Sequence, residues 1–383
     1  MLEKVKIKYL FKSMKKLSDS IIELDCLRII NNVDLKKISN SKILILGSNG
    51  FLARYILSVI SFANNNYDLN CKVLCSSYSK PKSFLKKIMI EDKKVGFLRA
   101  NLNNKNDLKK FLKKKYDFIF HCATYGQPSL WMKDQLSTIN LNTSVLKFFL
   151  DKSKKDNSSI LYFSSADVYG HVNKIKKPIT EIYNFENIPN LGRSAYGGSK
   201  RIGESLCRYY KEKYNVKAYV VRPAHTYGPG QDINDRRAIS EFIKKGIFNK
   251  KIDMLDAGSS IKTFGYISDI TEMFFNIILF GKKTEYNTTG LDYVSIMDLA
   301  KNISKNLNNI KIVTPKNNSK LIHIGSDIDK VIISSERYIK EFKKKDFVSF
   351  ENGIRNVVNW NLSNLKKWLD MELGVLVEGI MDQ

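Results

Sequence analysis

The chain has 383 residues, which is long enough for a large buried core and for two or three domain-sized units. Hydrophobic residues make up 43% and charged residues 27% of the sequence, so the composition excludes wholesale disorder and favours a soluble globular protein. The 64 basic and 38 acidic residues give a net charge of +26, which suits nucleic acid, an acidic membrane surface or an anionic small substrate. The lysines are scattered, as in 109–115, without interleaved stacking aromatics, so we expect no nucleic-acid partner.

Cysteine and histidine are sparse. The five cysteines have neither metal-ligand spacing nor the pattern of a small disulfide scaffold, and the four histidines do not cluster. No run approaches the roughly 18 to 20 apolar residues that a membrane span needs, and the N-terminus lacks a signal-peptide pattern. We therefore expect a cytoplasmic protein with no metal site and no transmembrane segment.

Residues 1–40 alternate basic and apolar positions, which predicts a helical N-terminal extension of two short amphipathic helices. Packing against the main domain or a partner subunit is the favoured interpretation of this extension. Binding of its basic first helix to a membrane surface is the alternative.

From Lys42 onward, short apolar runs alternate with helix-length segments. The runs are 43–46, 72–75, 95–98, 118–120, 160–163 and 218–221. Such alternation is typical of βαβ units, and it predicts an α/β fold with a Rossmann-type doubly wound parallel sheet over residues 41–222.

After Pro223 the alternation loosens. The pattern predicts helices near 238–245, 297–307 and 362–373 and a strand near 251–255. We expect residues 223–383 to form mainly a smaller C-terminal lobe that closes over the carboxyl edge of the sheet and binds substrate, because ligands of open α/β folds bind at that edge.

A glycine turn follows the first predicted strand directly. Gly47-Ser48-Asn49-Gly50-Phe51-Leu52-Ala53 comes after strand 43–46 and before helical sequence. Gly47 allows a tight turn, Gly50 lets the backbone approach a pyrophosphate, and the small Ala53 permits close packing of helix and strand. The turn therefore predicts that residues 41–222 bind a dinucleotide, NAD or NADP.

The second strand, 72–77, bears on the choice between these cofactors. An acidic residue at its end would grip the ribose 2′-hydroxyl of NAD, but Ser76, Ser77 and Lys80 stand there instead. Hydroxyls and a cation suit the 2′-phosphate of NADP, and both cofactors stay open.

Tyr196 and Lys200 are four residues apart in a predicted helix, hence on the same face. A nearby ammonium stabilises a phenolate, so we expect Lys200 to lower the pKa of Tyr196 toward the range of a general base. Ser164 and Ser165 follow strand 160–163 and supply a hydroxyl.

In these motifs the chain resembles the extended short-chain dehydrogenase/reductase superfamily, specifically its nucleotide-sugar epimerase, dehydratase and decarboxylase group. The resemblance covers about residues 41–360. The motifs that carry it, in order, are the Gly47 turn, His121 to Thr124, Ser164 to Gly170, Tyr196 to Arg201, Arg222 to Pro229, Asn234 to Arg237 and Lys262 to Asp269.

The resemblance implies a shared first step and a set of binding residues. Tyr196 would remove the proton of a sugar hydroxyl, usually at C4, while hydride passes to the nicotinamide, with Ser165 bonded to the same oxygen and Lys200 holding the nicotinamide ribose. The cofactor-binding residues would be Gly47, Asn49, Gly50, Phe51, Leu52, Ser76, Asn101, Leu102, Cys122, Ala123, Thr124, Tyr196, Lys200 and Pro223. The residues binding a nucleotide-diphosphate sugar would be Gln127, Ser165, His225, Arg237 and Lys262.

The resemblance also implies a homodimer, formed through the helices around 196–210 and 138–150. The apolar contacts would come from Leu206, Tyr209, Leu146 and Phe149, although some of these side chains must face the sheet instead.

The step after oxidation is open. In 4,6-dehydratases an Asp-Glu pair follows the Ser/Thr, whereas this chain has Ala166 and Asp167, which disfavours dehydration. The 165–170 run looks like that of 4-epimerases. Segments 121–142 and 234–237 are similar to UDP-glucuronate decarboxylases, and Lys262 stands where those enzymes carry an Arg, either near a sugar carboxylate or at the diphosphate.

We therefore favour a nucleotide-diphosphate-uronate decarboxylase, with a 4-epimerase next and a 4,6-dehydratase or ketosugar reductase after it. Asp167 either acts as a catalytic base at C5 or orients its loop. A different class is a non-catalytic NAD(P)-sensing or RNA-associated protein, but a sensor needs none of Ser165, Tyr196 and Lys200.

Overall fold

The computed structural model describes residues 19–126, 128–170, 177–183, 191–315 and 330–365. The predicted helix within 1–18, most of the predicted helix 362–373 and the candidate substrate residue Gln127 lie outside these ranges. In the described parts of the chain, no helix combines the length and the apolar character needed to cross a membrane.

Seven parallel strands form the main sheet, in the order β10-β6-β5-β4-β1-β2-β3. Their bounds are β1 Lys42–Leu46, β2 Lys72–Ser77, β3 Val95–Arg99, β4 Phe118–His121, β5 Ser159–Phe163, β6 Lys217–Pro223 and β10 Glu285–Thr288. The apolar runs read from the sequence are these strands, because a parallel sheet covered on both faces buries nearly every side chain. The sheet confirms the predicted doubly wound fold.

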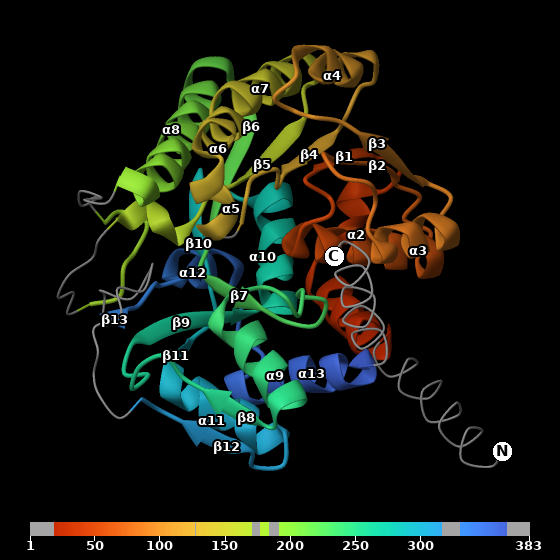
Figure 1. The fold of residues 1–383 in the computed structure, drawn as a ribbon. Coiled ribbons are helices and arrows are strands. Elements are labelled where there is room, and N and C mark those ends of the chain that lie inside the picture. The colour runs from red at the N-terminus through yellow and green to blue at the C-terminus, as the bar shows by residue number, and fades with distance from the viewer. Residues whose placement is uncertain (1–18, 127, 171–176, 184–190, 316–329, 366–383) are drawn as a thin grey trace, which may run out of the picture.

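Helices cover both faces of the sheet (Figure 1). The helix over 19–32, α2 (Phe51–Asn66) and α10 (Ile267–Phe280) share one hydrophobic cluster with one face. On the other face, α7 (Ser144–Asp156) and α8 (Leu191–Tyr214) share another. The remaining helical segments of this half are η1 Leu35–Ile38, α3 Ser83–Glu91, α4 Lys105–Lys109, η2 Lys110–Lys113, α5 Pro128–Lys133, α6 Gln135–Asn142 and η3 Ala166–Tyr169.

Residues 19–32 of the N-terminal extension are held against the main domain by polar contacts. Arg28 forms an ion pair of 2.7 Å with buried Asp269 of α10. The hydroxyls of Tyr55 and Tyr266 each donate to Asp25 at 3.0 Å. Burial raises the pKa of the Asp25 carboxyl to about 7, and these hydrogen bonds oppose that rise. The extension thus joins α2 to the segment that leads into α10.

A smaller group of elements lies below the main sheet in Figure 1. Strand β9 (Ile261–Tyr266) pairs with β7 (His225–Tyr227), β11 (Asp292–Ser295) and β13 (Lys330–Val331), and β8 (Lys251–Asp253) pairs with β12 (Lys311–Val313). The helices here are α9 Ala238–Asn249, α11 Ile296–Asn306 and α13 Phe350–Ser363, whereas α12 Glu336–Phe342 packs against β10 of the main sheet. Between them the chain returns to the main domain as α10 and β10, so the lobe is not one continuous stretch of sequence.

A buried ion pair connects the strands and the helix that surround the predicted catalytic residues. The guanidinium of Arg222, in β6, donates to both carboxylate oxygens of Glu204, in α8, at 2.8 and 2.6 Å. Ser164 donates to the same carboxylate at 2.6 Å, and Arg222 also donates to the Tyr169 hydroxyl at 2.8 Å. The network ties α8 to the ends of β5 and β6 and to η3.

We predict that Glu204→Gln destabilises the fold by roughly 3 to 5 kcal/mol, because it leaves the buried Arg222 cation without its charged partner. The free energy of unfolding in urea measures the effect. Glu351→Gln is the matched control, since the Glu351–Lys305 ion pair is half-exposed or more on both sides and its loss should leave the free energy of unfolding nearly unchanged. Equal losses in the two variants would contradict the prediction.

Candidate active site

The turn after β1 requires glycine at its first position. Gly47 has φ +75°, and a Cβ atom there would lie 2.8 Å from the backbone of Cys122 and Ala123, which follow β4. The Gly50 amide donates to the Gly47 carbonyl at 2.9 Å, and Gly50 is the N-cap of the 16-residue helix α2. The turn therefore brings two strand ends together and leaves the first amides of a long helix without a side-chain cap, which suits a phosphate group.

Two buried hydroxyls beside this turn have no hydrogen-bond partner among the described residues. They belong to Ser76, at the end of β2, and Thr124, after β4. Buried polar groups normally form hydrogen bonds, so these two unpaired hydroxyls indicate room for a bound ligand. They lie at the carboxyl ends of β2 and β4, next to the point where the strand order reverses. A dinucleotide fits this cradle.

Asn49 lies in the turn but bonds to protein. Its amide donates to the Ser79 hydroxyl at 2.8 Å and to the Lys80 carbonyl at 2.9 Å, and its oxygen accepts from the Lys82 amide at 3.0 Å. Asn49 thus fixes the loop after β2, whose first residues carry hydroxyls and lysines and no carboxylate.

The other predicted cofactor residues lie at the same edge of the sheet. Phe51 and Leu52 begin α2, Asn101 and Leu102 follow β3, Cys122 follows β4, and Pro223 ends β6.

Ser165, Asp167 and Tyr196 lie together where β5 ends. Ser165 is the N-cap of η3; its hydroxyl donates to an Asp167 carboxylate oxygen at 2.9 Å, and the Asp167 amide lies 3.2 Å from the serine oxygen. The Tyr196 phenol lies close enough to the Ser165 hydroxyl for the serine to favour its ionised form. Lys200, one turn further along α8, donates to the Phe163 carbonyl at 2.5 Å, and its nitrogen lies 5.7 Å from the centre of the Tyr196 ring.

The charge states of Tyr196 and Lys200 are set mainly by burial. Tyr196 is 7% and Lys200 1% exposed. Burial raises the pKa of Tyr196, and the Asp167 carboxylate raises it further, while the Ser165 hydroxyl and the charge of Arg237 oppose the rise. Burial also lowers the pKa of Lys200 to about 7. The predicted lowering of the Tyr196 pKa is therefore wrong for the protein alone, because loss of water disfavours the phenolate more than its neighbours favour it.

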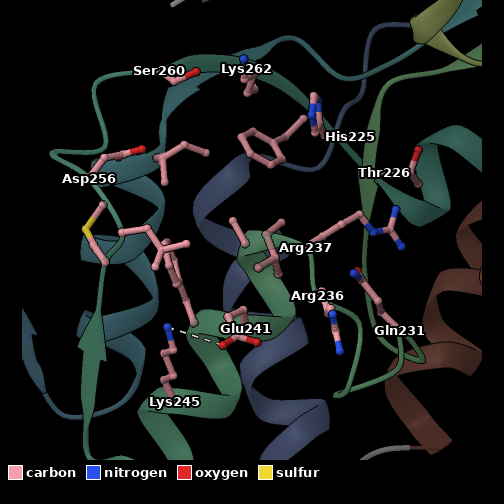
Figure 2. Close-up of a pocket in the computed structure, with 17 residues that line it drawn as sticks. His225, Thr226, Gln231, Arg236, Arg237, Glu241, Lys245, Asp256, Ser260 and Lys262 are labelled. Atoms are coloured by element: carbon pink, nitrogen blue, oxygen red, sulfur yellow. Dashed lines mark ion pairs between the residues drawn. The ribbon is translucent and has the colours of Figure 1, made fainter. Parts of the chain in front are cut away.

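A pocket of about 350 Å³ lies beside this group, between α9 and the β7 and β9 strands (Figure 2). Figure 2 shows His225, Ser260 and Lys262 on one side and Arg236, Arg237 and Glu241 on the other. Its apolar walls include Phe242, Met254, Leu255, Phe264 and Ile296. Cations beside an apolar wall suit an anionic ligand that carries a flat or apolar group.

Arg237 is held in place before α9 begins. Its guanidinium donates to both oxygens of the buried Asp235 carboxylate, at 3.0 and 2.5 Å, and its side chain leaves the N-terminus of the 12-residue helix uncapped. Arg237 acts electrostatically on Tyr196, and Asp167 acts on both Tyr196 and His225. The cationic pocket and the Ser165–Tyr196 pair therefore form one site.

Sequence reasoning missed several residues of this site. Arg236 lies in a motif that was quoted for the resemblance, yet only Arg237 was selected from it. Trp131 stacks on Tyr196 with the ring centres 5.3 Å apart, and Asp235 orients Arg237. Trp131 leaves no spacing signal, because only the fold brings it to Tyr196. Asp235 stands two residues before Arg237 in the same motif, so this local pair of opposite charges is a signal that the sequence does carry. His121, whose two ring nitrogens are buried without a partner in the described structure, was placed only as part of a motif.

A family model described as the NAD-dependent epimerase/dehydratase family matches residues 43–288. UDP-glucuronic acid decarboxylase 6 from Arabidopsis thaliana is 28% identical over 235 residues, which are 61% of this chain and 65% of that protein. A dTDP-4-dehydro-6-deoxy-D-allose reductase from Streptomyces sp is 24% identical over 214 residues, 54% of this chain and 65% of that protein. The chain thus spans slightly less than two thirds of the length of these curated relatives.

Among solved structures, UDP-glucuronic acid 4-epimerase from Bacillus cereus, in complex with UDP-glucuronic acid and NAD, matches with a TM-score of 0.67. The two are 21% identical, and the match covers 83% of this chain and 98% of that one, which shows a shared fold. Because the family model spans more than half of the sequence, the chain belongs to the family of NAD-dependent epimerase and dehydratase enzymes, which confirms the resemblance drawn from its motifs.

Proposed function

We propose that this chain modifies the sugar of a nucleotide-diphosphate sugar by oxidising it at C4. The observation that carries the proposal is the single site in which the Ser165–Tyr196 pair adjoins a pocket rich in cations. A diphosphate bound between Arg237 and the start of α9 would place the nucleotide base against the pocket's apolar walls. It would place the sugar beside Tyr196. The nucleotide-sugar names of the relatives support this substrate class.

The chain's own residues have separate tasks in the first step. Tyr196 takes the proton of the sugar hydroxyl, and Ser165, which lies close to the phenol, holds the same oxygen. Lys200 is fixed by the Phe163 carbonyl beside the phenol and supplies donors for a cofactor ribose. When bound, the nicotinamide accepts hydride, and its positive charge in the oxidised form favours the phenolate. The family's cofactor is NAD, and the acid-free end of β2 keeps NADP as the alternative.

For the second step we favour decarboxylation of a uronate, with 4-epimerisation next. The decarboxylase names of several relatives support this order. Lys262 supports it too, because it lines the pocket and supplies a cation for a sugar carboxylate or for the diphosphate. Dehydration is disfavoured because Ala166 cannot protonate a leaving hydroxyl. A ketosugar reductase stays a further alternative, and a cytoplasmic location stays a prediction.

Tyr196→Phe should reduce turnover by about a hundredfold or more while cofactor binding stays nearly intact, because the change removes only proton transfer. The assay incubates the protein with a panel of nucleotide-sugars and measures product mass. Loss of carbon dioxide identifies decarboxylation, loss of water dehydration, and an unchanged mass with a new retention time epimerisation. Tyr214→Phe, at the far end of the same helix, is the control that should keep full turnover. If Tyr196→Phe keeps an activity within a few fold of wild type, the proposed mechanism is wrong.

Asp167→Asn distinguishes the two roles of the acid that contacts Ser165. If Asp167 acts on the ketosugar, the amide should preserve oxidation and block the later step, so the absorbance of reduced cofactor accumulates. We expect Asp167 to orient its loop and Ser165 instead, because the Ser165 hydroxyl donates directly to this carboxylate. In that case oxidation and product formation slow together, and no reduced cofactor accumulates. Stopped-flow absorbance beside product mass measures this. Asp298→Asn is the control, since Asp298 also accepts from a nearby serine but lies in α11.

The homodimer remains a proposal, with a corrected contact surface. Leu146 and Phe149 are fully buried within the chain and face its own sheet, so they are not available to a partner. Leu136 in α6 is 77% exposed, and Ile202 and Tyr209, seven residues apart on α8, are 53% and 51% exposed. Helices α6 and α8 pack against each other, so this apolar surface would form the four-helix contact with Leu206 at its edge.

Ile202→Glu should convert a wild-type dimer into monomer, because it places a charge in the apolar contact. Sedimentation velocity over a range of concentrations measures the change. The control is Ile90→Glu, which changes an isoleucine that is 68% exposed on α3, away from this surface. A wild-type protein that sediments as a monomer at every concentration would contradict the proposal.

A further inference from the structure

Trp131 in α5 is buried, whereas the residues directly before and after it are exposed. Its indole is 4% exposed, whereas its neighbours Leu130 and Met132 are 46% and 37% exposed. Helix α5 has six residues, and it exposes two large apolar side chains and buries a third between them. The contact that the buried side chain makes therefore helps to hold the helix in place. What Trp131 contacts is therefore informative about why this short helix lies where it does.

The contact is the ring of Tyr196. The two rings are nearly parallel, with 15° between their planes and 5.3 Å between their centres. This geometry covers one face of the phenol, and Tyr196 is left only 7% exposed although it lies beside a pocket. The phenol hydroxyl stays close to Ser165, so the indole covers the ring without occupying the position of the reacting hydroxyl.

We propose that Trp131 is a positioning residue for Tyr196: the stacked indole holds the phenol against Ser165 and keeps solvent off its ring. The proposal rests on the role of Tyr196 as the base in the proposed function, and Trp131 itself moves no proton. An aromatic ring is suited to this task because face-to-face contact restricts rotation of the phenol and leaves its edge free to bond.

The stack also has an electrostatic consequence. Burial is the largest cause of the raised pKa of Tyr196, and the groups that add to or oppose it are Asp167 from η3, Ser165, and Arg237 from the segment before α9. Lys200 lies on the same helix as Tyr196. Removing the indole admits water, so the phenol should ionise at lower pH and the acidic limb of the kcat profile should move to lower pH. Loss of a merely structural contact would not shift that limb.

The first test needs no turnover. Nitration of tyrosines with tetranitromethane requires access to the phenol, and peptide mass spectrometry of the cofactor-free full chain reports each tyrosine separately. We expect Tyr196 in Trp131→Ala to be nitrated at least tenfold faster than in wild type, and Trp131→Phe to protect it nearly as well as tryptophan. Tyr67, which is 49% exposed at the end of α2, is the internal reference and should react equally in every variant. An unchanged Tyr196 rate in Trp131→Ala would overturn the proposal.

The second test uses the nucleotide-sugar that the panel identifies. Trp131→Ala should lower kcat at least tenfold, with a KM within about threefold of wild type and the acidic limb moved to lower pH; Trp131→Phe should restore most of kcat. Leu130→Ala and Met132→Ala change exposed side chains of the same helix and should leave all three readouts unchanged. Circular dichroism confirms that each variant folds.

The outcomes separate the two proposals. A raised KM with an unchanged kcat and pH profile would make Trp131 a sugar contact and overturn the positioning role. If wild type turns over no nucleotide-sugar, the proposed function fails, and the nitration rates still decide whether Trp131 shields Tyr196.

Discussion

The buried ion pair between Arg222 and Glu204 is the constraint on which the site depends. A guanidinium and a carboxylate that are both almost fully buried are tolerated only with full hydrogen bonding, and here Ser164 and Tyr169 complete it. These partners come from β6, α8, the end of β5 and η3, so satisfying one pair of charges fixes four elements. Ser165 follows Ser164 directly and Tyr196 lies two turns before Glu204, which places both at a set distance from each other.

The same low-dielectric surroundings decide how the base behaves. Burial disfavours the Tyr196 phenolate and the Lys200 ammonium alike, and it moves both toward their neutral forms. In the proposed mechanism, a positive charge bound beside the phenol would favour its ionised form. Proton transfer would then depend on occupation of the cofactor cradle, whose unpaired buried hydroxyls lie at the ends of neighbouring strands. The chain provides geometry and a closed environment, and the bound groups complete the charge balance.

The proposed substrate pocket is built from a second set of elements that the chain reaches only after the parallel sheet is nearly complete. Arg237 is fixed by Asp235 at the start of α9, and Lys262 comes from β9, while α10 and β10 return to the main domain between β9 and β11. Because the lobe is entered and left through the main sheet, its cations are held close to Tyr196. This arrangement explains how Tyr196 and Arg237, which are far apart in the sequence, act on one another.

The sequence by itself determined the strands of the parallel sheet, the glycine turn and the Ser165, Tyr196 and Lys200 set, because each leaves a local signal in period, spacing or residue type. Local signals also predicted that Lys200 would lower the pKa of Tyr196, and here the prediction failed, since spacing says nothing about burial. Only the tertiary structure decided that Leu146 and Phe149 face the core, that Arg237 lies near Tyr196 and that Trp131 covers Tyr196. Each of these contacts joins residues that meet only when separate elements pack, and a linear pattern carries no record of that meeting.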